Sequence, residues 1–237
     1  MAKLASKSEP LIGWAWNVTT GGVAYLVNEA GIDLRGQNQD AIKGLLKQYG
    51  STPFIRRKSA ADRGTGTHNV MELLGKGELS LDEAEAHIDA EVPPVERGYS
   101  RAGLKWFREQ QPEPFLVEEP LLSFRHRVAG TGDLGAVRTV DSGPLQGSGL
   151  RVFTDYKTSS GIYDEHQYQV DGYLMLAAEQ AGMGIPNRDF DLGSVLRLKE
   201  DGTYEEKFFE PDPRMFMALT EAWWAQEAFK AKAKEGK

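Results

Sequence analysis

A carboxylate and a lysine stand two residues apart at the end of the most strand-like segment of the sequence. That segment is Leu150–Thr154, and Asp155, Tyr156 and Lys157 follow it. Successive strand side chains point to opposite faces, so Asp155 and Lys157 are expected on one face and Tyr156 on the other. A carboxylate at a strand end can bind a hard divalent cation, and the lysine can orient a water molecule beside it. Alone, such a pair is more commonly an exposed ion pair.

A second carboxylate is expected at a neighbouring strand. Asp133 follows Gly130-Thr-Gly132 where another strand should begin. Two carboxylates on adjacent strands repel each other unless a cation or a proton compensates their charge. The usual compensation at neutral pH is a metal ion with oxygen ligands, which keeps positions open for water and phosphate. By itself, Asp133 is equally typical of a turn aspartate that accepts hydrogen bonds from backbone amides.

Three polar residues on expected helices could complete such a site. His68 opens one helix, and a single helical histidine is more often a packed or capping residue. Gln169 and Tyr173 lie four apart on a later helix and therefore share a face. From there they could reach over the Asp155 strand towards phosphate or water. The default alternative is that Tyr173 belongs to the core and Gln169 to the surface.

The segment Gly130-Thr-Gly132-Asp-Leu-Gly135 also fits the dinucleotide-binding pattern G-x-G-x-x-G. Such a loop binds a pyrophosphate only where a helix follows, because the amides of the helix N-terminus must face the anion. Here residues 134–140 continue as a strand and run into a turn. Nucleotide binding is therefore disfavoured, and the sequence has no Walker-type Gly-Lys-Ser either.

The elements expected to position these residues follow one order: helices, a meander of strands, a strand, a helix, a hairpin and a final helix. This order predicts one α/β unit, with an N-terminal helical part at 1–110 that contributes the histidine and a sheet-containing core at 111–237. The expected helices are 14–29, 40–48, 67–74, 80–89, 101–110, 166–182 and a last one from 213 onward, and the expected strands are 115–119, 121–125, 133–137, 150–155, 195–199 and 204–209.

The composition excludes several kinds of site. The chain has 237 residues, a formal net charge of −7 and no cysteine, which rules out disulfides, thiolate zinc sites, iron–sulfur clusters and a cysteine nucleophile. No apolar run approaches the roughly 18 residues that span a bilayer, and the N-terminus lacks a signal-peptide pattern. We therefore expect a soluble cytoplasmic protein with no membrane partner. The negative charge disfavours a protein that coats nucleic acid but is compatible with a nuclease, whose carboxylates hold a cation.

Read together, these residues resemble the RecB-like branch of the PD-(D/E)XK nucleases. That branch has, in order, a helical histidine, a Gly-x-x-Asp strand, an Asp/Glu-x-Lys strand and Gln-x-x-x-Tyr on a helix. The segment 60–68 also resembles phage-encoded exonucleases and the mitochondrial genome maintenance exonuclease. The match covers residues 62–177, about half of the chain. The matching residues are His68, Gly130-Thr-Gly-Asp133, Asp155-Tyr-Lys157 and Gln169-Val-Asp-Gly-Tyr173.

The resemblance implies a restriction-endonuclease-like core, in which helices flank a mixed central sheet. It also implies one or two Mg or Mn ions as cofactor. The four cysteines that hold an iron–sulfur cluster in helicase-fused and CRISPR-associated members are absent here, and the chain is too short for a helicase motor. The implied metal ligands are His68, Asp133, Asp155 and the backbone carbonyl of Tyr156.

The resemblance also assigns roles beside the metal. Lys157 would position the attacking water and help to stabilise negative charge at the phosphate. Glu119 matches an acidic position on the preceding strand and could support the ligands or bind a second metal. Strand alternation, however, puts only one of Glu118 and Glu119 inward. The implied catalytic set is Asp133, Asp155, Lys157, Glu119, Gln169 and Tyr173.

The leading interpretation is a metal-dependent DNA exonuclease that acts at single- or double-stranded ends. It would serve phage or bacterial recombination, repair or replication. The bacterial or phage-infected cell would be its location. A structure- or site-specific endonuclease on the same fold is the second interpretation, and a DNA-binding accessory protein with a vestigial site is the third. A recombinase or helicase partner and an oligomer are compatible with each of them. The basic residues expected to contact DNA are Arg56, Arg57, Lys58, Arg63, Lys105, Arg108, Arg125 and Arg127.

Overall fold

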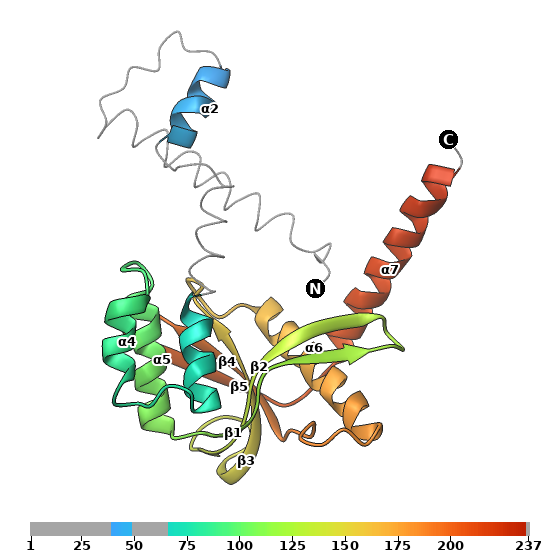
Figure 1. Cartoon of the computed structure of the whole chain (residues 1–237). Coiled ribbons are helices and arrows are strands. Elements are labelled where there is room, and N and C mark those ends of the chain that lie inside the picture. The colour runs from blue at the N-terminus through green and yellow to red at the C-terminus, as the bar shows by residue number, and fades with distance from the viewer. Residues whose placement is uncertain (1–38, 49–65, 236–237) are drawn as a thin grey trace. The chain divides into compact units, whose positions relative to one another are not determined.

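The computed structural model describes residues 39–48 and 66–235 (Figure 1). The chain divides into two compact units, of which one contains Arg63–Lys237 and the other Lys3–Asp62. The smaller unit contains helix α2, Gln39–Gln48. The larger unit contains the sheet together with the helices that cover it. The boundary expected near residue 110 therefore falls inside this larger unit.

A five-stranded mixed sheet forms the centre of the larger unit, with its strands in sequence order (Figure 1). The first three strands are antiparallel neighbours, the third and fourth run parallel, and the last two are again antiparallel. A parallel pair requires a crossover connection, which helix α6 supplies. The strands are β1 (Glu113–Ser123), β2 (Val128–Val140), β3 (Gly147–Lys157), β4 (Leu192–Leu198) and β5 (Tyr204–Phe209).

The helices that precede the sheet in the chain cover one of its faces. Met71 and Trp106 come from these helices and are fully buried in one apolar cluster with Leu134 and Tyr156 of the sheet. Removing this apolar surface from water holds the helices against the strands. The packing of Met71 also fixes His68, which lies one turn earlier on the same helix. These helices are residues 66–76, α4 (Ala84–Glu91) and α5 (Arg97–Gln110).

Helix α6 (Asp164–Gly182) covers the opposite face. Val170 and Leu174 lie four residues apart on its buried side and pack in a second apolar cluster that includes Phe153 of β3. The long helix α7 (Arg214–Glu235) follows β5 and contacts α6. Among the described residues, no helix combines the length and the hydrophobicity that a membrane crossing needs.

The expected α/β class with a mixed central sheet is confirmed, with corrections to the element boundaries. Segments 115–119 and 121–125 were expected as two strands but form the single strand β1. The separating Pro120 is tolerated because β1 lies at the edge of the sheet, where one side of a strand needs no amide donor. Helix α5 begins at Arg97 rather than at 101. The helix expected at 14–29 lies outside the described residues.

Candidate metal centre

Strands β1 and β2 both change faces at one position, and acidic residues occupy it. Val117 packs on the helical cluster of residues 66–76, α4 and α5, whereas Leu121 is buried on the α6 side. Residues four apart in a regular strand share a face, so the chain must turn over between them. The turnover occurs at Glu118, whose φ of 47° lies in the left-handed region. On β2, Gly132 likewise faces the α6-side Phe153 while Leu134 belongs to the helical cluster, and Asp133 stands between them.

This turnover brings two carboxylates to the imidazole of His68. The His68 Nδ1 atom lies 3.5 Å from Glu118 Oε1 and 3.7 Å from Asp133 Oδ1. One ligand atom from each of the three residues lies within 4.8 Å of the other two. Oxygen ligands at about 2.1 Å from an octahedral cation are about 3 Å apart when adjacent and about 4 Å apart when opposite. The two distances from His68 Nδ1 lie between these values, which is compatible with one divalent cation shared by the three residues.

The chemistry of the donor set also fits such a cation. Glu118 Oε1 is buried and accepts no hydrogen bond from the described residues. A buried carboxylate oxygen without a donor is costly unless a cation or proton compensates it. With two carboxylates, one imidazole and no thiolate, the site favours Mg²⁺ or Mn²⁺ over a structural zinc ion.

Strand β3 adds Asp155 and Lys157 beside this triad. Leu134 pairs with Thr154 in the β2–β3 register, so the next positions, Asp133 and Asp155, lie across from each other. Lys157 Nζ forms an ion pair with Asp155 Oδ2, and the two side chains are 18% and 1% exposed. Both therefore project to one face, as strand alternation predicts. A partly accessible ammonium group thus stands beside a buried carboxylate at the edge of the site.

Tyr156, between them, points to the opposite face. Its ring meets the His68 ring edge-on, with centroids 5.5 Å apart, and its backbone amide donates a 2.7 Å hydrogen bond to Asp133 Oδ2. The amide fixes one oxygen of Asp133, while the other oxygen, Oδ1, is the one that lies 3.7 Å from His68 Nδ1. The Tyr156 carbonyl stays a predicted ligand.

Helix α6 reaches this site through the two residues that the spacing singled out. Gln169 Nε2 lies 3.3 Å from Asp155 Oδ1 and 3.2 Å from the Tyr173 hydroxyl, and it donates to both oxygens. Burial and the nearby charge of Asp155 raise the pKa of Tyr173, so this hydroxyl stays protonated. Tyr173 is 8% exposed and belongs to the α6-side apolar cluster, as the core alternative predicts, whereas Gln169 is partly buried rather than on the surface.

Negative charge is concentrated at the centre of this arrangement, on the carboxylates beside His68. Burial, together with the Asp155 carboxylate, raises the pKa of Asp133 to about 7. Burial acts to lower the pKa of His68, but the nearby carboxylates of Glu118 and Asp133 outweigh it, and the net pKa is raised above 6.5. Both shifts express an excess of negative charge in a region of low water content. A divalent cation would remove that excess directly.

Glu118, rather than Glu119, is the acidic residue of β1 that joins the site. Glu119 Oε2 instead accepts a 2.6 Å hydrogen bond from Arg188, which also donates to Gln180. The sequence indicates that only one of the two neighbours faces inward, but not which one. The left-handed backbone at Glu118 makes the choice, and no turn residue marks it in the sequence.

The three glycines of the G-x-G-x-x-G match have a packing role on β2. A Cβ on Gly130 would lie 2.6 Å from the Tyr173 ring, and one on Gly132 would lie 2.9 Å from the Phe153 ring. A Cβ on Gly135 would lie 2.9 Å from the rings of both Phe115 and Phe190. The glycines let aromatic side chains lie directly on the strand, and β2 runs through them without the helix that a nucleotide site needs.

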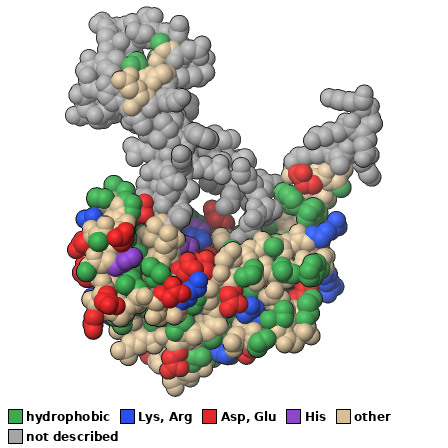
Figure 2. Space-filling view, viewed as in Figure 1, with side chains coloured by type: hydrophobic (Ala, Val, Ile, Leu, Met, Phe, Trp, Pro, Cys, Tyr) green, Lys and Arg blue, Asp and Glu red, His purple; other side chains and the backbone are tan. Residues whose placement is uncertain are grey.

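The basic residues expected to contact DNA have different surroundings. Lys105 lies 3.9 Å from Glu109, and Arg108 donates to the Leu81 carbonyl at the surface. Arg125 and Arg127 lie exposed in the connection between β1 and β2. Figure 2 shows acidic and basic side chains interspersed on the face that it presents. Arg56, Arg57, Lys58 and Arg63 lie outside the described residues.

The arrangement as a whole can hold a hard divalent cation next to an ammonium group and two amide or hydroxyl groups. This combination suits the hydrolysis of a phosphate ester, because developing negative charge would meet positive charge from two directions. In the comparisons with known proteins, neither a protein-family model nor a curated sequence matches the chain.

Proposed function

We propose that the protein is a Mg²⁺- or Mn²⁺-dependent DNA exonuclease of the restriction-endonuclease-like fold. The observation that carries the proposal is the convergence of His68, Glu118 and Asp133 beside the Asp155–Lys157 ion pair. The order of the motifs along the chain, which resembles that of the RecB-like nucleases, supplies the substrate class.

His68, Glu118 and Asp133 would hold the metal, with Asp155 as a further ligand from across the strand pair. When bound, the ion supplies Lewis-acid charge for the phosphate oxygens and lowers the pKa of a coordinated water. The raised pKa of Asp133 is consistent with this role, because a carboxylate that lacks its cation tends to retain a proton.

Lys157 acts as the positioning cation in this proposal. Its ammonium group donates hydrogen bonds but accepts none, so it can hold a water molecule by its lone pair and direct it towards phosphorus. The same charge stabilises the oxyanions that develop on the phosphate. Asp155 keeps the lysine in place through their ion pair, and Gln169 in turn orients Asp155.

An assay with matched variants tests the proposal. Linear and closed circular DNA are incubated with Mg²⁺, Mn²⁺ or a chelator, and the products are resolved on gels. We expect metal-dependent loss of linear DNA only, and a decrease of at least about 100-fold for Asp155→Asn, which exceeds the effect of removing a group that merely supports a ligand. Asp189→Asn is the control, because Asp189 is 74% exposed and pairs with Arg151.

Each alternative has its own result in this assay. Nicking of closed circles would replace the exonuclease with an endonuclease on the same fold. DNA binding without cleavage would favour an accessory protein with a vestigial site. Equal activity of Asp155→Asn and the parent protein would overturn the assignment of the site.

A further inference from the structure

The connection between β1 and β2 presents an aromatic side chain to solvent. Phe124 follows the last residue of β1 and is 78% exposed, the largest exposed fraction among the exposed large hydrophobic side chains of the described residues. Arg125 and Arg127 beside it are also exposed. We refer to residues 124–127, Phe-Arg-His-Arg, as the hairpin tip. A single exposed ring is common on protein surfaces, but here two exposed guanidinium groups stand beside it, so the tip combines an aromatic face with positive charge.

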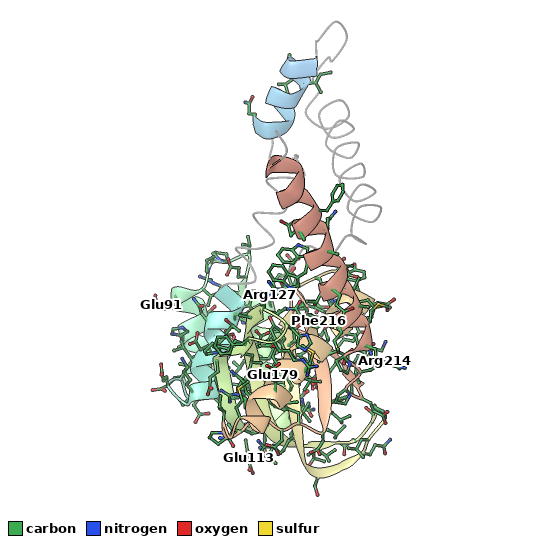
Figure 3. All side chains as sticks on the ribbon, turned by 90° about the vertical axis from the view of Figure 1, so that its right-hand side faces the viewer. Glu91, Glu113, Arg127, Glu179, Arg214 and Phe216 are labelled. Atoms are coloured by element: carbon green, nitrogen blue, oxygen red, sulfur yellow. The ribbon has the colours of Figure 1, made fainter. Side chains whose placement is uncertain are left out.

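The hairpin tip has a fixed shape. The His126 amide donates a 2.9 Å hydrogen bond to Ser123 Oγ, and the His126 carbonyl accepts a 3.1 Å bond from Trp224 Nε1 of α7. The Arg127 guanidinium lies over the Trp224 ring, 4.9 Å from its centroid. Figure 3 shows Arg127 beside α7. Because these contacts hold the tip, little conformational entropy is lost when it binds a partner.

The tip carries two positive charges, those of Arg125 and Arg127. Within the described ranges 39–48 and 66–235, no carboxylate lies within ion-pair distance of Arg125 or Arg127. Arg101, in contrast, pairs with both Glu85 and Asp89. Two unpaired guanidinium groups next to an exposed ring match the chemistry of single-stranded nucleic acid, in which phosphates alternate with base faces.

The distance from the tip to the candidate metal centre also suits a nucleic acid strand. Phe124 is six residues after Glu118 on one side of the hairpin, and Arg127 is six residues before Asp133 on the other. At about 3.3 Å per residue, both strands span about 20 Å. With about 3.4 Å per nucleotide along a stacked strand, this length corresponds to about six nucleotides.

We propose that the hairpin tip binds unpaired DNA about six nucleotides from the cleaved phosphate, with Phe124 stacked on a base and the two arginines on phosphates. This inference rests on the proposed nuclease function for the position of the cut, whereas the binding itself can be measured without cleavage. A single exposed ring with two cations is small for a protein interface, which needs about 800 Å² per partner.

Fluorescence anisotropy with labelled oligothymidylates in chelator tests the binding. For a 12-nucleotide probe we expect Phe124→Ala and Phe124→Leu to weaken affinity at least about fivefold, because both remove the stacking surface. A 4-nucleotide probe is long enough to cover the tip alone, so the same variants should weaken its binding as well. Val95→Ala is the control, since Val95 is 64% exposed on the α4–α5 connection. Arg125→Ala should lower the salt dependence of binding by about 0.7 in the log–log slope.

The outcomes separate this inference from the proposed function. Loss of 12-nucleotide binding in both Phe124 variants supports the tip, whether or not the parent protein cleaves DNA. If Phe124→Leu binds the 12-nucleotide probe as tightly as the parent and Phe124→Ala does not, the ring buries apolar surface rather than stacks on a base. This result would overturn the proposed stacking of Phe124 on DNA. If the parent protein cleaves DNA in the presence of metal and Phe124→Ala binds and cleaves equally well, the binding role of the hairpin tip would also be overturned. The nuclease assignment would then remain intact. A parent protein with no affinity for the 12-nucleotide probe would overturn the tip as well.

Discussion

Glu118 and Asp133 stand at corresponding positions of β1 and β2, between the pairs Val117–Leu134 and Glu119–Gly132, where both strands change faces. Two acidic side chains are thereby placed together beside His68 in a largely buried position. An arrangement that served only the fold would put apolar residues there, since buried carboxylates cost stability. The local backbone strain and the electrostatic repulsion thus occur at the same place, which is typical of sites that bind a cation.

The two neighbouring glutamates should behave differently when each loses its charge. We expect Glu118→Gln to lower metal-dependent nuclease activity by more than about 100-fold, because it removes a ligand rather than a group that supports one. Glu119→Gln should keep its activity, since Glu119 binds Arg188 and not the triad. Steady-state cleavage rates of both variants, measured at saturating Mn²⁺, would make the comparison.

The stability of the same two variants provides the control. Glu119 is 43% exposed, so weakening its ion pair should cost no more than about 1 kcal/mol in urea unfolding. Glu118→Gln relieves repulsion in the metal-free protein and should leave the free energy of unfolding unchanged or slightly raised. The reverse pattern, an inactive Glu119→Gln and an active Glu118→Gln, would reassign the site to Glu119.

The stability of the metal-free protein should fall as the pH rises from about 4 to about 7. The pKa of Asp133 is about 7 in the folded protein and 3.8 for the free carboxyl group, so the folded state binds this proton more tightly. Stability from this group is therefore complete below about pH 4 and is lost as the pH rises through 7. The raised pKa of His68 acts in the same direction above pH 6.5. Three pKa units correspond to about 4 kcal/mol.

Urea unfolding in chelator at several pH values measures this loss. The Asp133→Asn variant lacks the titrating group and should show a much flatter profile over the same interval. Parallel profiles for the parent and the variant would mean that Asp133 does not hold its proton in the folded state.

Mn²⁺ should raise the melting temperature, because it binds the folded site and not the unfolded chain. At a free concentration of about 100 times Kd, the gain is about 2.7 kcal/mol. The gain should be larger at pH 8 than at pH 5, since protons compete with the metal for Asp133. His68→Asn should lose most of the Mn²⁺-induced rise in melting temperature, whereas His87→Asn, on α4, should keep this rise. Thermal scans with Mn²⁺, Mg²⁺ and chelator distinguish these cases, and equal gains in both histidine variants would argue against the triad.

Most of the fold could be predicted because the spacing of apolar residues and the residue types that favour turns are properties of short stretches of sequence. Asp201-Gly202 marks the β4–β5 hairpin, and the residues of α6 repeat at helical spacing. Strand alternation likewise predicts Asp155 and Lys157 on one face, since it is a property of any regular strand. Pro120 predicts a break between 115–119 and 121–125 that the structure does not have, because the edge position that tolerates a proline is a tertiary feature.

The remaining part of the site depends on packing that the sequence does not express locally. The choice between Glu118 and Glu119 follows from a left-handed residue in mid-strand, and no glycine or asparagine announces it. The exposure of Phe124 could not be foreseen either, because Phe-Arg-His-Arg is equally compatible with a strand. Both features arise where elements distant in sequence meet, at His68 in one case and at α7 in the other.

A buried ion pair that makes no contact with the His68–Glu118–Asp133 triad should contribute to stability alone. Arg138 and Glu206 have side chains that are 1% and 8% exposed, and Glu206 also accepts the indole hydrogen of Trp106. Arg138→Met would leave Glu206 buried without its cation, at a cost of about 3–5 kcal/mol. The unfolding midpoint in urea should drop accordingly. Mn²⁺ should still raise the melting temperature of the Arg138→Met variant about as much as that of the parent, since Arg138 does not contact the triad.

Gly130→Ala should disturb catalysis through α6 without touching His68, Glu118 or Asp133. A Cβ at this position would lie 2.6 Å from Tyr173 Cε1 and 3.2 Å from its hydroxyl, so the ring must move. Gln169 donates to both Tyr173 and Asp155, and a displaced ring would therefore alter the orientation of the Asp155 carboxylate. We expect a tenfold or larger decrease in kcat, on the order of the effect of losing a group that orients a ligand.

The Mn²⁺-induced shift in melting temperature should stay nearly unchanged in Gly130→Ala, because His68, Glu118 and Asp133 keep their places. Gly182→Ala, at the end of α6 with open space around its added methyl group, should leave both quantities unchanged. A normal kcat in Gly130→Ala would show that the contact of Tyr173 with Gln169 serves only the packing of α6 on the sheet.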